Sequence, residues 1–128
     1  MKPAGCAVCP SSRPPAPSLA SDAGLSDNKP LHVHVLVQGK EKTATRLKLM
    51  QFKNAPGKKV DNAYLHSSYG ISYLSVFVTD ITSTLERAAR HGVRPVAKGP
   101  VAIGGKRFLA IVRDPDGNLI ELIGPKAD

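Results

Sequence analysis

The feature that most constrains the fold is one short helix pattern set between strand patterns in the C-terminal part of the chain. Its apolar residues form a narrow stripe at helical spacing: Ile81, Leu85, Ala88, Ala89 and Gly92. Asp80 is the expected N-cap, with Thr82 and Ser83 as alternatives. Ser83 would pair with Glu86 in a capping box. Gly92 can adopt the positive φ that ends a helix, so the sequence predicts a helix between Asp80 and Gly92.

A strand pattern precedes this helix at residues 71–78. Successive side chains of a strand point to opposite faces, so the pattern divides into two sets. The odd-numbered positions face one way: Ile71, Tyr73, Ser75 and Phe77. The even-numbered positions that face the other way are all apolar: Leu74, Val76 and Val78. We therefore expect this strand to present two chemically different faces.

Three short strands are predicted after the helix, at residues 94–98, 108–113 and 119–123. Gly99-Pro100 breaks the chain after the first of them. Asp114-Pro-Asp-Gly-Asn118 is expected to join the last two strands as a tight hairpin, because its proline presets φ and its glycine can take φ above zero. The C-terminal part is thus predicted to be a strand, a helix and then three strands.

Two strands and no helix are predicted upstream of this unit, at residues 31–37 and 45–52. Asn54-Ala-Pro-Gly57 breaks the second strand, and residues 58–69 form a polar connection without a clear period. We therefore expect the folded part of the chain to run from residue 31 to residue 125.

Residues 1–30 have a different composition and hold six of the eleven prolines. Such a segment cannot bury enough apolar surface to form a core, so we predict a disordered tail. Cys6 and Cys9 have the spacing of a zinc or redox pair, but their context favours two exposed thiols. No unbroken apolar stretch follows Lys2, so the N-terminus does not resemble a secretory signal peptide. We therefore expect a cytoplasmic protein, with mitochondrial import as the alternative.

Composition excludes several classes of protein. The 128 residues allow one domain of ordinary size, and two cysteines cannot staple a secreted scaffold. No apolar run approaches the roughly 20 residues of a membrane-spanning helix. The net charge of +8 is compatible with an anionic partner, either a small molecule or a nucleic acid.

Three motifs, taken in order and spacing, resemble the vicinal oxygen chelate superfamily. They are Gly70-Ile-Ser-Tyr-Leu-Ser-Val-Phe-Val-Thr-Asp80, His91-Gly-Val93 and Arg113-Asp-Pro-Asp-Gly-Asn-Leu-Ile-Glu-Leu-Ile123. That superfamily includes glyoxalase I, bleomycin- and fosfomycin-resistance proteins, methylmalonyl-CoA epimerase and extradiol dioxygenases. The resemblance implies an α+β fold with a complete βαβββ module at residues 70–125. Residues 31–57 would be the last two strands of an incomplete first module, so the curved mixed sheet would form a half or partial cup.

The resemblance also implies what such a cup can hold. In the superfamily, two modules pair around a divalent metal such as Zn, Ni, Mn or Fe. The metal is bound by a His or Gln from the first strand and a Glu from the last strand of each module, and it polarises a substrate carbonyl. If this chain is active, the resemblance implies a lyase, isomerase or dioxygenase of the glyoxalase I type.

Carried over residue by residue, this ligand set is incomplete here. Glu121 stands at the position of the C-terminal Glu ligand, which makes it the candidate catalytic and metal-binding residue. Tyr73 stands where the first-strand His would fall, and Lys48 stands at the Glu that ends the first module. The fourth ligand would come from a strand that the chain lacks. His32 and His34 share a strand face but carry no motif.

Other residues are candidates for ligand binding in the cup. Tyr73 and Phe77 would lie on its surface, Arg107 follows a glycine-rich turn that would border it, and Lys48 would attract a carboxylate or phosphate. Lys48 belongs to a cluster of seven basic residues offset by one acidic residue, Glu41. The basic members of the cluster are Lys40, Lys42, Arg46, Lys48, Lys53, Lys58 and Lys59.

Three functions follow as hypotheses. The first is a glyoxalase-like domain that binds a small, anionic ligand in the cup without the complete metal centre. The second is a metal-dependent enzyme of the superfamily whose site is completed by a second chain. The third is a basic nucleic-acid-binding or scaffolding module, which no base-reading element supports. Because an unpaired half-sheet exposes an edge and an apolar face, we also expect a homodimer or a swapped dimer.

Overall fold

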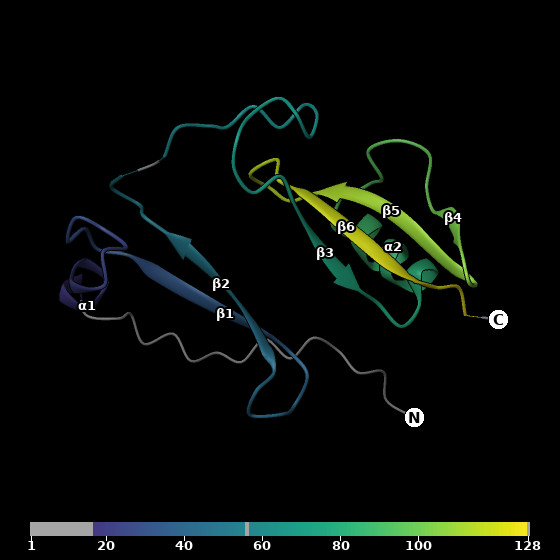
Figure 1. Ribbon diagram of the computed structural model, residues 1–128, viewed down its shortest axis with the longest axis horizontal. Coiled ribbons are helices and arrows are strands. Elements are labelled where there is room, and N and C mark those ends of the chain that lie inside the picture. Colours follow the sequence, from purple (N-terminus) through teal and green to yellow (C-terminus); the bar gives the residue numbers. More distant parts are fainter. Residues whose placement is uncertain (1–16, 56, 128) are drawn as a thin grey trace. The chain divides into compact units, whose positions relative to one another are not determined.

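A computed structural model describes residues 17–55 and 57–127 and shows an α+β protein (Figure 1). The chain divides into two compact units, Met1–Lys58 and Lys59–Asp128, called here the N-terminal and the C-terminal unit. The N-terminal unit contains α1 (Pro17–Asp22), β1 (His32–Gln38) and β2 (Thr45–Gln51). The C-terminal unit contains β3 (Tyr73–Phe77), α2 (Ile81–Arg90), β4 (Val101–Gly104), β5 (Arg107–Arg113) and β6 (Leu119–Pro125).

The N-terminal unit is built on a two-stranded antiparallel sheet of β1 and β2. The two strands predicted from alternation are confirmed to within one residue at their ends. Their register pairs His34 with Leu49 and Val35 with Lys48, so those two pairs lie on opposite faces of the ribbon. Both faces of this two-stranded sheet mix apolar and polar side chains.

The tail predicted over residues 1–30 lies partly outside the described residues, and Cys6 and Cys9 fall in that undescribed part. Within residues 17–30 the structure differs from the prediction, because Pro17–Asp22 forms the short helix α1. Proline fits the first turn of a helix, where its missing N–H leaves no hydrogen bond unmade. A proline-rich composition therefore did not prevent this turn of helix.

The C-terminal unit is a four-stranded sheet in the order β3-β6-β5-β4, with α2 against one face (Figure 1). β3 runs parallel to β6, while β6, β5 and β4 are antiparallel neighbours. Ile81 of α2 is fully buried and packs against three buried side chains of the sheet: Ala110, Val112 and Leu122. Val76 and Val78 join this core, so the even-numbered face of the predicted strand faces the helix.

The helix begins and ends where the sequence predicts. The carboxylate of Asp80 accepts hydrogen bonds from the backbone N–H groups of Thr82 at 3.0 Å and Ser83 at 3.3 Å, so the direct N-cap forms. At the other end, Gly92 adopts a φ of 77°. The Gly92 N–H then donates to Ala89 and the following N–H to Ala88, a Schellman ending.

The strand predicted at residues 94–98 is wrong. This segment is irregular, with a single backbone hydrogen bond from the Val96 N–H to the Ile111 carbonyl oxygen, and the strand begins only at Val101. Pro95 and Pro100 explain the shift, because neither has an N–H to donate to a sheet ladder. β4 therefore starts after the second proline, where Val101 pairs with Leu109.

The predicted hairpin between the last two strands is confirmed. Gly117 has a φ of 89°, and its N–H donates to the Asp114 carbonyl oxygen at 3.0 Å. The Asp114 side chain accepts from the Asn118 N–H at 2.8 Å, which closes the turn.

Among the described residues, no helix is both long enough and apolar enough to cross a membrane.

Candidate functional site

The face of the C-terminal sheet that lies opposite α2 carries the candidate site. Val76 of β3, Ala110 of β5 and Leu122 of β6 pack toward the helix. The residues directly before and after each of them along the strand therefore point to the other side of the sheet. We call this surface the open face. It presents these side chains: Tyr73, Ser75, Phe77, Leu109, Ile111, Arg113, Leu119, Glu121 and Ile123.

Glu121 lies at the centre of the open face. The register places Ser75 of β3 on one side of it and Ile111 of β5 on the other. The Ser75 hydroxyl donates a hydrogen bond to Glu121 Oε1 at 2.5 Å. Along β6 its same-face neighbours are the apolar Leu119 and Ile123, and Glu121 itself is half-buried. One carboxylate is thus held in an apolar strip by a neighbouring hydroxyl, with further acceptor capacity left for another donor.

Two aromatic side chains flank this pair on β3. Tyr73 is 47% exposed and stands opposite Leu119, and Phe77 is 62% exposed and stands opposite Ile123. Both therefore share the open face with Glu121, as their odd-numbered positions predict. The sequence predicted these three residues as site residues, and the structure brings them together.

The two predicted basic residues are placed differently. Arg107 is exposed at the start of β5, where it pairs with Pro125, whereas Glu121 pairs with Ile111. Four residues along a strand separate positions by about 13 Å, so Arg107 lies at the far end of the open face from Glu121. Lys48 is exposed on β2 and belongs to the N-terminal unit.

Two residues that the sequence reasoning missed position the site. Ser75 could have been found, because it lies between Tyr73 and Phe77 on the same strand face. Arg113 opens the third motif, but the sequence gave it no role of its own. Its guanidinium donates to the carbonyl oxygens of Gly117 at 2.7 Å and Ala63 at 3.4 Å, which ties the connection before β3 to the hairpin.

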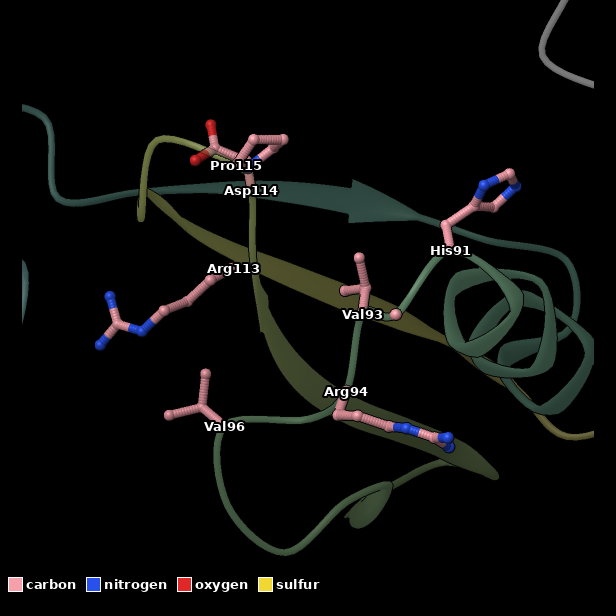
Figure 2. Close-up of a pocket in the computed structure, with 8 residues that line it drawn as sticks. His91, Val93, Arg94, Val96, Arg113, Asp114 and Pro115 are labelled. Carbon is pink, nitrogen blue, oxygen red and sulfur yellow. The ribbon is translucent and has the colours of Figure 1, made fainter.

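An open pocket of about 600 Å³ lies at the C-terminal end of α2 and does not include Glu121 (Figure 2). His91, Arg94 and Arg113 are among its lining residues. Figure 2 shows the Arg94 and Arg113 side chains extending in opposite directions, and the His91 ring turned away from both. The two guanidinium groups do not converge on one point, so this arrangement does not form a paired anion clamp.

A second open pocket of about 400 Å³ lies between α2 and the segment that follows it. Its lining includes the apolar residues Leu85, Ala89 and Val93 and the charged residues Glu86 and Lys126. Lys126 lies over the ring of Phe108, with Nζ 4.3 Å from the ring centroid. Neither pocket includes Glu121, Ser75, Tyr73 or Phe77, and the first pocket shares only Arg113 with the open face.

Residues 27–122 match the family model of the Glyoxalase/Bleomycin resistance protein/Dioxygenase superfamily. The chain belongs to this superfamily. The match spans both units, so the resemblance carried by the three C-terminal motifs is confirmed and extends to the two upstream strands. No curated protein sequence matches the chain significantly.

Solved structures of the glyoxalase superfamily share this fold. A glyoxalase family protein from Bacillus cereus has a TM-score of 0.67 at 20% identity, over 97% of this chain and 77% of that one. The trypanothione-dependent glyoxalase I of Leishmania major has a TM-score of 0.54 at 21% identity, over 85% and 76% of the two chains. A glyoxylase/bleomycin resistance protein/dioxygenase domain from Frankia sp. has a TM-score of 0.52 at 17% identity, over 79% and 68%.

The residues around Glu121 do not fit the divalent-metal centre that glyoxalase superfamily members use. A bound divalent ion of this kind needs several imidazole, thiolate or carboxylate ligands. The neighbours of Glu121 on the open face offer a hydroxyl, a phenol and aliphatic groups instead. Within residues 17–55 and 57–127, no group of three or more His, Cys, Asp or Glu side chains could hold a metal ion.

Proposed function

We propose that this glyoxalase superfamily member binds a small molecule on the open face of its C-terminal sheet, with Glu121 as the polar anchor. The observation that carries the proposal is the half-buried Glu121 carboxylate held by Ser75 in the middle of an apolar strip. A structural core does not require a carboxylate at this position, and burying one is costly unless a partner compensates it. Apolar surface with a few placed polar groups is typical of ligand sites.

The chemistry of these side chains defines what they can recognise. Glu121 accepts hydrogen bonds, so it would bind a ligand hydroxyl, amide or ammonium group. The Tyr73 phenol adds a second hydrogen-bonding group, and the Phe77 ring offers apolar area. A carboxylate positioned in this way can also take a proton from a carbon next to a carbonyl, which is the step of a lyase or isomerase.

The charge of the chain favours an anionic ligand. Seven basic residues lie between Lys40 and Lys59 against the single acidic Glu41, and Lys48 is exposed. A local excess of positive charge raises the concentration of anions near the molecule. We therefore infer a ligand that carries both an anionic group and an apolar part, as thioethers of glutathione and acyl-CoA compounds do.

Two-dimensional NMR of the ¹⁵N-labelled chain tests the proposal, with S-hexylglutathione and coenzyme A as the probes. We expect saturable shifts of the backbone amides around Ser75, Ile111 and Glu121. Glu121→Gln should weaken binding by about tenfold, because it removes a charged hydrogen-bond acceptor. Glu86→Gln is the matched control, since Glu86 is an exposed carboxylate on α2, across the sheet.

The outcomes separate the proposal from its rivals. Shifts confined to the pocket at the C-terminal end of α2, or equal affinity in the Glu121→Gln and Glu86→Gln variants, would overturn it. No saturable shift with either probe would contradict the anionic ligand class.

The metal-dependent enzyme is the second candidate, because Glu121 occupies the position of a metal ligand in the superfamily. Elemental analysis after incubation with Zn, Ni, Mn or Fe salts decides between the two. We expect no metal that depends on Glu121. One equivalent of metal, lost in Glu121→Gln and kept in Glu86→Gln, would establish the metal-dependent reading, with the remaining ligands supplied by a second chain.

A further inference from the structure

Two histidines stand side by side on one face of β1, outside the site described above. His32 and His34 flank Val33, and both side chains are exposed. The antiparallel register places Gln51 of β2 opposite His32 and Leu49 opposite His34. All four side chains therefore share one face of the two-stranded sheet. Figure 1 shows the strands β1 and β2 that form this sheet.

We propose that His32 and His34 chelate a divalent transition-metal ion such as Ni²⁺, Cu²⁺ or Zn²⁺, with the amide oxygen of Gln51 as a third ligand. Alternate residues of a strand stand about 6.6 Å apart, and each imidazole nitrogen binds such an ion at about 2.0–2.1 Å. One ion can therefore lie between the two rings. Imidazole suits Ni, Cu and Zn among the common metals, and water completes the coordination.

The backbone pairing keeps both histidines in position. His32 is the first residue of β1 and pairs with Gln51, the last residue of β2, while His34 lies two residues further into the ladder and pairs with Leu49. A pair of ligands held at fixed spacing loses less conformational freedom on binding than two ligands on a flexible loop. The ribbon thus presents the two imidazoles already on one side.

The charges of the ribbon favour this face over the other. Arg46 and Lys48 pair with Val37 and Val35, so these cations lie on the opposite face from the histidines. The residues that share the face with the histidines are uncharged: Leu36, Gln38, Thr45, Leu47, Leu49 and Gln51. A dication therefore meets no cation of β1 or β2 on the same face.

This site is independent of the function proposed for the open face. It lies in the N-terminal unit, and Glu121 lies in the C-terminal unit. It also differs from the superfamily's metal centre in its ligands, because it uses two imidazoles and an amide from neighbouring strands. Failure of one proposal leaves the other intact.

Calorimetric titration of the full chain with NiCl₂ tests the proposal, in a Cys6→Ser, Cys9→Ser background that removes competing thiols. We expect one equivalent of Ni²⁺ to bind. His32→Asn and His34→Asn should each weaken binding at least tenfold, and Gln51→Leu should weaken it a few-fold. His66→Asn is the matched control, because His66 is exposed and stacks on Tyr64 with the ring centroids 5.7 Å apart.

A spectroscopic readout separates chelation from a loss of folding. Electron paramagnetic resonance of the Cu²⁺ complex should show two coupled nitrogens in the parent chain and one in His34→Asn. Circular dichroism of each variant should match the parent. Equal Ni²⁺ affinity in the His32→Asn and control variants, or two coupled nitrogens remaining in His34→Asn, would overturn the proposal.

Discussion

At the scale of single residues, two carboxylate side chains have different roles because their surroundings differ. Glu121 is half-buried and takes a hydrogen bond from a side chain 46 residues away. Asp80 is held by backbone groups next to it in the chain, Thr82 and Ser83. The first arrangement leaves a carboxylate in apolar surroundings, which suits recognition, and the second completes the end of a helix.

The capping role of Asp80 leads to a prediction about pH. Hydrogen bonds, from Ser83 first and then from the Ala127 N–H, hold the pKa of Asp80 below its ordinary value of 3.8. A carboxyl group whose pKa is lower in the folded state stabilises that state above its unfolded pKa. The contribution is lost as the pH falls through the folded pKa. We therefore expect this stabilisation to be complete near neutral pH and to fade below about pH 4.

Thermal unfolding of Asp80→Asn and Asp80→Ala measures this effect. Asp80→Ala should lower Tm by a few degrees at neutral pH, because the cap is lost. Asp80→Asn keeps a capping oxygen, so its Tm should stay closer to the parent at neutral pH and converge with it in acid. A constant difference between Asp80→Asn and the parent from pH 7 to pH 2.5 would contradict this account.

At the scale of elements, the parallel contact of β3 with β6 depends on close approach at one end. The Val78 N–H donates to the Ile123 carbonyl oxygen at 2.8 Å, directly beside Gly124. Gly124 is buried, and a Cβ added there would collide with the backbone carbonyl oxygen of Val78. This glycine therefore lets β3 lie against β6, which brings Ser75 to Glu121.

Gly124→Ala should consequently destabilise the C-terminal unit. The clash involves backbone rather than the end of a flexible side chain, so the strands must separate. We expect the free energy of unfolding to fall by about 2 kcal/mol or more, measured by urea denaturation. Gly57→Ala is the control, because nothing lies within 4 Å of a Cβ added at Gly57, and its effect should stay within about 0.5 kcal/mol. Equal stability of the two variants would refute the explanation.

At the scale of the whole molecule, each unit leaves strand edges and apolar side chains accessible within the described residues. β3 and β4 are the edge strands of the four-stranded sheet, and β1 and β2 form a sheet of two strands. Leu49 of β2 is 48% exposed and Tyr73 of β3 is 47% exposed. Such edges and surfaces promote association between chains.

We therefore expect the chain to self-associate as a homodimer or a swapped dimer. Sedimentation velocity over a range of concentrations should show a dimer that dissociates on dilution. Tyr73→Lys or Leu49→Lys should shift the population toward monomer, because a charge on the contact surface opposes burial. Thr82→Lys, an exposed change on α2, should leave the distribution unchanged. A well-folded monomer at every concentration would contradict the expectation.

The sequence by itself determined the features that depend on neighbouring residues. The helix start at Asp80, the helix end at Gly92 and the turn at Asp114–Asn118 were predictable because the hydrogen bonds that define each of them join residues only a few positions apart. The alternation in residues 71–78 likewise predicted which side chains share a face, since strand periodicity is local.

Only the tertiary structure decided how distant segments meet. Nothing local shows that Ser75 pairs with Glu121 or that Arg113 reaches Ala63, because strand register is set by packing across the sheet. The observed β4 starts later than the strand predicted from the sequence for the same reason. A strand forms only where its backbone can bond to a partner strand, and the prolines before Val101 have no N–H to donate. The candidate site lies on one face of a sheet whose register is non-local, so the sequence named most of its residues and the fold brought them together.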